Sequence, residues 1–254
     1  MRIRPTPPSP PLFRVLLAGA CCLWMGHAIP GGVTAGSFGG DLESRVEALN
    51  LFDEGLELGI EVAVEGQGVI YTRSASVARS AASAIKTAVL LDLLMVLGDQ
   101  LEAVPAGVES LLRPGTHPAF TGFTPEQLAR CREALTGRTH RELARIMMGR
   151  VPATNQAYNA ACNVIMVKLG GPRAISERLR ALDPALSGID INRYMEYWNG
   201  DGDNRATPSA LVALYSMVSR GQVSGLDAER TTILRELVLA TGDGGPGSVF
   251  GKAG

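Results

Sequence analysis

The sequence predicts an α+β fold in which a helical subdomain packs beside an antiparallel sheet, and three observations support this. Residues 58–73 alternate apolar and polar side chains around Gly66 and Gly68, which indicates a two-stranded hairpin. Residues 83–168 carry a succession of helical patterns. Residues 242–254 combine glycine-rich turn signals with a short apolar run, which indicates a turn that enters a strand. Strands therefore flank a mainly helical middle.

The composition is that of a globular protein. Hydrophobic residues make up 46% of the 254 residues and charged residues 19%, which is enough apolar material for the core of a domain. The formal net charge is -1, and basic and acidic residues are interleaved. Because nucleic acids and anionic membrane surfaces attract clusters of basic residues, neither is an expected partner.

The first 28 residues have the features of an export signal. Three arginines precede a short apolar run over 15–25, and cleavage after Ala28 fits a small-residue site. A membrane-spanning helix needs about 20 apolar residues, so this run is too short. We therefore expect residues 1–28 to be a signal peptide and the mature protein to be periplasmic or secreted. The alternative is a lipoprotein leader that ends at Cys21, with the lipid as the membrane anchor.

Helix and loop signals follow one another along the chain. Periodic apolar positions predict the helices, and clusters of proline and glycine mark the loops between them. In chain order, the predicted elements are a helix at 41–57, the hairpin at 58–73, a buried helix at 83–97, a loop at 113–123, helices that begin near 124, 139 and 155, a loop at 197–208 and a helix at 207–221.

Capping signals predict the ends of three helices. Thr124 followed by Pro125 marks a helix start, because threonine caps free N–H groups and proline suits the first turn. Thr139 and Glu142 have the spacing of a capping box. The third helix stops at the glycines and proline of 170–172.

Two cysteines remain outside the leader. Cys131 and Cys162 both lie in helical patterns. An exported protein can join such a pair as a disulfide, but the spacing alone does not establish the geometry that the bond requires. Two separate buried thiols are the preferred interpretation, and the disulfide is the alternative.

Ser83 and Lys86 stand at the start of the predicted buried helix. Positions i and i+3 of a helix share a face, so the two side chains can meet. A serine hydroxyl becomes nucleophilic when a neighbouring base takes its proton, and apolar surroundings favour the neutral amine that can act as this base. Free N–H groups at a helix start can also hold a developing oxyanion. The pair therefore predicts nucleophilic catalysis by Ser83 with Lys86 as base.

The lysine content strengthens this interpretation. The chain has only three lysines, Lys86, Lys168 and Lys252, among many arginines. Arginine cannot lose its proton in a protein, so a site that needs a base cannot use it. The alternative is a chance pair in which Ser83 caps the helix and Lys86 extends to water.

These residues resemble the motifs of the class A β-lactamase and penicillin-binding serine hydrolase family. Ser83-x-x-Lys86 and Lys252-x-Gly254 are similar to its first and third motifs. The segment NAACNVIMVKLGGP at 159–172 resembles the family segment that begins at the end of the second motif. This likeness places Asn159 at the asparagine that ends that motif, and Asn163 at a structural asparagine one helical turn later.

Two later segments extend the resemblance. RYMEYWN at 193–199 resembles the family's omega-loop segment, and DNRATP at 203–208 resembles the junction with the helix that follows it. The likeness covers about residues 45–254, with its segments in the family's order.

The resemblance implies a three-layer α/β/α catalytic domain at 41–254 that opens β-lactam bonds through an acyl-serine intermediate. It implies no cofactor and no metal. It also implies a monomer whose partner is a small β-lactam or peptidoglycan-like molecule. The residues that it assigns are Ser83, Lys86 and Glu196 to catalysis, and Asn159, Lys252 and Gly254 to substrate binding.

Several positions depart from the family pattern. Ala157 and Ala253 replace hydroxyl residues of the second and third motifs, and the family's water-activating glutamate aligns with Met195, one place before Glu196. The sequence also ends at Gly254, where the family continues into further strands, so we expect a domain that lacks its C-terminal strands. These departures leave two alternatives open. One is a non-catalytic or weakly active penicillin- or peptidoglycan-binding relative, and the other is a D-Ala carboxypeptidase or glutaminase with the same Ser-x-x-Lys pair.

Other catalytic constellations have little support. The chain has no Gly-x-Ser-x-Gly elbow, and only His117 and His140 lie outside the leader, which argues against a Ser-His-Asp triad. The run NGDGDN at 199–204 resembles part of a calcium loop but lacks the completing glutamate. A plain turn is the expected structure there.

Overall fold

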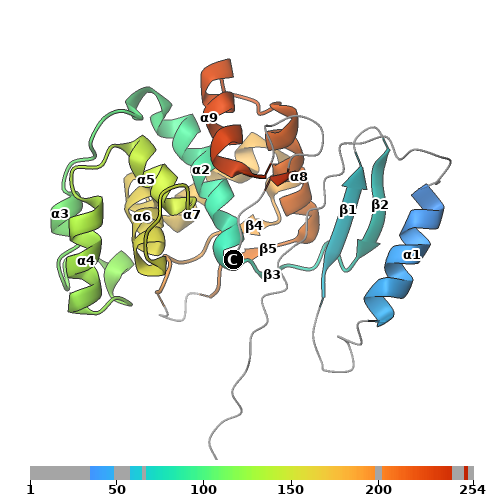
Figure 1. Cartoon of the computed structure of the whole chain (residues 1–254), viewed down its shortest axis with the longest axis horizontal. Coiled ribbons are helices and arrows are strands. Elements are labelled where there is room, and N and C mark those ends of the chain that lie inside the picture. The colour runs from blue at the N-terminus through green and yellow to red at the C-terminus, as the bar shows by residue number, and fades with distance from the viewer. Residues whose placement is uncertain (1–34, 49–57, 65–66, 198–201, 242–248, 251–254) are drawn as a thin grey trace, which may run out of the picture.

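A computed structural model describes residues 35–48, 58–64, 67–197, 202–241 and 249–250 (Figure 1). The α-helices are α1 (Ala35–Ala48), α2 (Ile85–Leu97), α3 (Val108–Leu111), α4 (Pro125–Leu135), α5 (His140–Met147), α6 (Asn155–Lys168), α7 (Pro172–Leu182), α8 (Pro208–Arg220) and α9 (Ala228–Val238). The strands are β1 (Ile60–Val64), β2 (Gly68–Arg73), β3 (Arg79–Ser80), β4 (Ile189–Asp190), β5 (Arg205–Ala206), β6 (Leu239–Thr241) and β7 (Val249–Phe250). The predicted leader at 1–28 lies outside the described residues.

The predicted hairpin is confirmed and forms the middle of a layered arrangement. Strands β1 and β2 pair antiparallel, with a register shift between Val62 and Ala63. Helix α1 contacts β2, and helix α8 contacts β1. Figure 1 shows the hairpin between these two helices. The α+β prediction is therefore confirmed, although the described strands form three small sheets, β1-β2, β3-β5-β4 and β6-β7, rather than one.

The predicted opening helix differs in its boundaries. Helix α1 begins at Ala35, six places before the predicted start, and ends at Ala48. Residues 49–57, the second half of that prediction, lie outside the described part of the chain. The strand predicted within residues 242–254 is present as β7, which pairs with β6.

Helix α2 forms the centre of the molecule. Its ten residues from Ile85 to Leu94 are all buried, because it contacts α6, α7 and α9 on different sides. Figure 1 shows it running between the group of α4, α5 and α6 and the pair of α8 and α9. The buried residues other than Lys86, Thr87 and Asp92 are apolar, as is typical of a helix that is covered on all sides.

The capping predictions are confirmed. Thr124 and Gln127 form a capping box at the start of α4, and Thr139 and Glu142 form one at the start of α5. Each box satisfies N–H groups that would otherwise lack a partner at the helix start. Helix α6 ends at Lys168, just before the glycines and proline of 170–172. The helices α4, α5 and α6 pack against one another as a helical subdomain.

A buried ion pair joins two of the layers. Asp92 of α2 is 1% exposed and accepts two hydrogen bonds from Arg178 of α7, at 2.8 and 2.6 Å. Arg178 also donates to the carbonyl of Leu169 at 2.7 Å, at the end of α6. One guanidinium thus holds the central helix to the two helices beside it.

Cys131 and Cys162 are both free and buried in the structure. The preferred interpretation, two separate thiols, therefore agrees with the structure and the disulfide alternative does not. No helix among the described residues combines the length and the apolar character that crossing a bilayer requires.

Candidate active site

Ser83 lies in a tight turn that leads into α2, and not in the α-helix itself as predicted. The turn is a 3-10 helix at Ala82–Ala84, and α2 begins at Ile85. Ala82 has a φ of 40°, in the left-handed region that residues with a Cβ rarely adopt. Such strained residues gather at functional sites, where the surrounding structure holds them in place. The backbone N–H of Ala81, just before the turn, donates to the carbonyl of Asn204 at 2.9 Å.

Lys86 is buried one turn after the serine. It is 1% exposed, and its Nζ donates to Oδ1 of Asn159 at 2.7 Å. The alternative in which this lysine extends to water is therefore wrong. Burial of an amine among apolar residues disfavours its charged form, and the neutral form is the one that can accept a proton.

Asn159 connects the lysine to a carboxylate. Its Nδ2 donates to Oε1 of Glu196 at 2.6 Å, and the asparagine itself is 4% exposed. One amide thus joins Lys86 of α2 to Glu196 of the loop between β4 and β5. The structure brings together three of the predicted site residues in one chain of hydrogen bonds, which starts one helical turn from Ser83.

Met195 occupies the position where the family resemblance places the glutamate, and its side chain is buried. It is 8% exposed, and Asn163 binds both polar atoms of its backbone. Oδ1 of Asn163 accepts from Met195 N at 2.7 Å, while Nδ2 donates to Met195 O at 2.9 Å and to Ala119 O at 2.7 Å. The carboxylate that reaches the site is therefore that of Glu196, the next residue.

An ion pair closes the base of the 192–204 loop, the segment from Asn192 to Asn204 that carries Glu196. Arg193 donates to Oδ1 of Asp203 from Nε at 3.1 Å and from Nη2 at 2.6 Å. Asn204 Oδ1 accepts from the backbone N–H groups of Asn192 and Arg193, at 2.9 and 3.0 Å. Asp203 and Asn204, the end of the calcium-like run, are thus engaged in protein contacts.

Gly122 is a contact of Glu196 that sequence reasoning missed. A Cβ added at Gly122 would lie 2.7 Å from the carbonyl carbon of Glu196 and closer still to its carbonyl oxygen. Real Cβ atoms are essentially never found within 3.0 Å of such an atom. The sequence predicts only that this glycine is one of several turn residues in the 113–123 loop. Nothing in the sequence indicates that it contacts residue 196, 74 positions further on.

Ala157 and Tyr158, which precede Asn159 in the second-motif segment, take no part in this chain of hydrogen bonds. Ala157, at the position of the family's second-motif hydroxyl, is buried on the first turn of α6. The hydroxyl of its neighbour Tyr158 accepts from the N–H of Ala153 at 3.1 Å, in the loop before α6. Lys252 and Gly254, the predicted substrate-binding pair, lie outside the described residues.

Cys162 lies one turn after Asn159 on α6 and is fully buried. Burial raises the pKa of its thiol to about 12, and the charge of Lys86 offsets only part of this effect. The thiol therefore stays protonated near neutral pH and is not a competing nucleophile.

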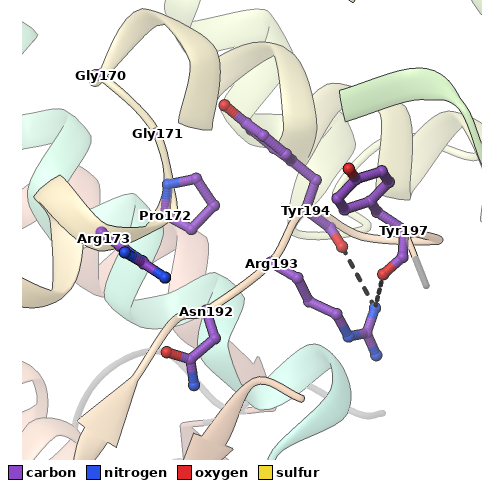
Figure 2. Close-up of a pocket in the computed structure, with 8 residues that line it drawn as sticks. All are labelled: Gly170, Gly171, Pro172, Arg173, Asn192, Arg193, Tyr194 and Tyr197. Carbon is purple, nitrogen blue, oxygen red and sulfur yellow. Dashed lines mark hydrogen bonds between the residues drawn. The ribbon is translucent and has the colours of Figure 1, made fainter. Parts of the chain in front are cut away.

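A pocket of about 290 Å³ lies beside the 192–204 loop (Figure 2). It lies between the start of α7 and the loop residues Asn192, Arg193, Tyr194 and Tyr197. Figure 2 shows Arg193 turned toward the carbonyl oxygens of Tyr194 and Tyr197, to which it donates at 3.3 and 3.4 Å. None of the predicted catalytic residues lines this pocket. In the described part of the chain, no three metal-ligating side chains come together.

Comparison with solved structures assigns the fold. The TLA-1 extended-spectrum β-lactamase matches with a TM-score of 0.61 and 18% identity, over 80% of this chain and 70% of that one. The β-lactamase from Streptomyces albus G matches with a TM-score of 0.56 and 21% identity, over 80% and 72%. The fold is that of a β-lactamase. A class A β-lactamase from Mycobacterium abscessus also matches, with a TM-score of 0.54 and 19% identity, over 81% and 70%.

The sequence itself is far from these β-lactamases. No protein-family model and no curated protein matches it. Because one fold hosts many activities, likeness at about this level of identity establishes the β-lactamase fold and leaves the function to be argued from the site.

Proposed function

We propose that the protein is a serine hydrolase of the class A β-lactamase type, which opens a β-lactam through an acyl-Ser83 intermediate. One observation carries the proposal: the hydrogen-bond chain Lys86–Asn159–Glu196, which links a carboxylate to the buried amine that follows Ser83 by three residues. A buried amine and a carboxylate linked to it suit the two proton transfers that acyl transfer needs.

The first half-reaction uses Ser83 and Lys86. Ser83 Oγ attacks the carbonyl carbon of the lactam while its proton passes to the neutral amine of Lys86. The lactam C–N bond breaks, and the proton is delivered to the departing nitrogen. The product of this step is an ester on Ser83. Free backbone N–H groups at the start of α2 would hold the developing oxyanion.

The second half-reaction uses Glu196. Its carboxylate takes a proton from a water molecule, whose oxygen adds to the ester carbon. The bond between that carbon and Ser83 Oγ then breaks, and the proton returns to the serine. Asn159 positions the carboxylate. Its amide oxygen accepts from Lys86 while its amide nitrogen donates to Glu196, so both ends of the amide are engaged. Lys252 keeps its proposed role of meeting the substrate carboxylate, and Gly254 keeps its proposed role in substrate binding.

Covalent labelling with a fluorescent penicillin tests the proposal. We expect the full chain to form a denaturation-stable adduct and Ser83→Ala to form none. Ser110→Ala, which removes an exposed serine of α3, is the matched control and should label like the original chain. Equal labelling of the Ser83→Ala variant would refute the acyl-Ser83 intermediate.

A penicillin- or peptidoglycan-binding relative without turnover is the second candidate, and Ala157 favours it. This residue is 4% exposed and has no hydroxyl to deliver a proton to the leaving nitrogen. Hydrolysis of a chromogenic cephalosporin separates the two functions. A Ser83-dependent adduct with no turnover above the Ser83→Ala level would favour the binding protein, and turnover above that level would favour the hydrolase.

A further inference from the structure

The backbone of Glu196 adopts an unfavourable conformation. Its φ is 61°, in the left-handed region that residues with a Cβ rarely adopt. A residue stays in this region only where its surroundings hold it there. Two of the holding contacts are hydrogen bonds: Asn163 binds the backbone of Met195 on one side, and Asn159 binds the Glu196 side chain.

The third holding contact is the close approach of Gly122. The carbonyl group of Glu196 occupies the space where any other residue at 122 would carry its Cβ. Gly122 does not itself have a positive φ, so its backbone conformation is open to every residue type. The glycine is therefore needed for the space it leaves and not for its conformational freedom.

We propose that Gly122 is a positioning residue for the deacylating carboxylate, and the inference rests on the function proposed above. The missing Cβ lets the peptide after residue 196 turn inward, and this turn aims the Glu196 carboxylate at Asn159 while Met195 stays in the core. Gly122 thus compensates for the shift of the glutamate by one place from the position that the family resemblance assigns to it.

The kinetic test separates acylation from deacylation. Gly122→Ala should label with the fluorescent penicillin as fast as the original chain, because Ser83 and Lys86 are untouched. Its adduct should persist longer by about tenfold or more, since the carboxylate that activates water has moved. Gly40→Ala is the control, because an added Cβ there meets nothing within 4 Å.

A double variant shows whether Gly122 acts through Glu196. Glu196→Gln alone should also prolong the adduct, and adding Gly122→Ala to it should change the lifetime little further, because the affected group is already gone. A full additional slowing in the double variant, or an unchanged adduct lifetime in Gly122→Ala, would overturn the inference.

A stability measurement covers the case in which Gly122→Ala does not fold. Glycine at 196 accepts more backbone conformations than glutamate, so Glu196→Gly should raise the Tm more in the Gly122→Ala background than in the original chain. If the two increases in Tm are equal, the contact between the two residues is not the reason for the glycine. This result does not depend on activity, so it separates a failure of the inference from a chain that never forms an adduct.

Discussion

At the scale of single residues, the most informative side chain is the amine of Lys86. Long basic residues are almost never fully buried unless a partner holds them, yet this one is 1% exposed in the centre of the molecule. It donates to Asn159 rather than lying at the surface. Burial of an amine costs desolvation free energy. An apolar side chain would fill the same space without this cost, so the lysine fits a catalytic role better than a structural one.

Replacement of the amine by a thioether separates these two roles. Lys86→Met keeps the length and removes the base, so we expect adduct formation with penicillin to slow by about 10²–10⁴-fold. The Tm should fall little, since loss of the hydrogen bond to Asn159 is offset by removal of a buried ionisable group. Stopped-flow labelling and a thermal melt measure the two quantities. Lys168→Met, at a half-buried position at the end of α6, is the control, and labelling of Lys86→Met at the original rate would contradict the role of base.

At the scale of elements, the 192–204 loop depends on one carboxylate at its base. Burial alone would raise the pKa of Asp203, but hydrogen bonds from Ser80 and Arg193 and from the N–H of Asn204 outweigh this and lower it below the usual range. The charged form is therefore the one that the folded loop prefers.

This preference makes the loop acid-sensitive. A carboxyl whose pKa is lowered in the folded state stabilises the protein above its ordinary pKa, near 3.9, and this stabilisation is lost as the pH falls through the lowered value. We expect Asp203→Asn to reduce the urea midpoint at pH 7, and we expect this difference to shrink as the pH falls below about 3.9, because the original chain then loses the charge as well. Glu133→Gln, which removes an exposed carboxylate, should show no such convergence. A constant difference across the pH range would contradict the role of the ion pair.

At the scale of the whole molecule, the pair of Asp92 and Arg178 holds the central helix to its neighbours. The carboxylate is 1% exposed, whereas about a third of the guanidinium side chain meets solvent. Removal of the arginine alone would strand a charge in the core, while removal of both leaves none. We therefore expect the single and the double replacement to lower the free energy of unfolding by very different amounts.

Unfolding experiments can resolve this difference. Arg178→Leu should lower the free energy of unfolding by about 3–5 kcal/mol, because Asp92 is left without its partner. The double variant with Asp92→Leu should be more stable than Arg178→Leu, since an apolar pair replaces a buried ion pair at little or no net cost. Chemical unfolding at pH 7 measures both values. A single variant as stable as the double would contradict the buried-pair argument.

The sequence predicts the elements whose signals are local. The capping boxes at Thr124 and Thr139, the glycines that end α6 and the alternation of the hairpin all act within a few residues. The left-handed residues Ala82 and Glu196 carry no such signal, because alanine and glutamate do not favour that conformation and only tertiary contacts impose it.

The same limit applies to the candidate site. Lys86 and Asn159 are recognisable from their motifs, but the choice between residues 195 and 196 as the inward-facing position depends on Asn163 and Gly122. These partners lie 32 and 74 positions before the residues that they hold. A one-residue shift in a loop reverses which side chain faces inward, and the local sequence does not determine it.

The buried thiol of Cys162 can serve as a probe of local opening of the core. Because the sulfur is wholly covered and sits one turn from Asn159, a thiol-reactive dye can reach it only when the central helices part. In a variant that keeps Cys162 and replaces the other three cysteines, the rate of dye uptake by the folded chain therefore measures how often the core beside Asn159 opens, without any reference to catalysis.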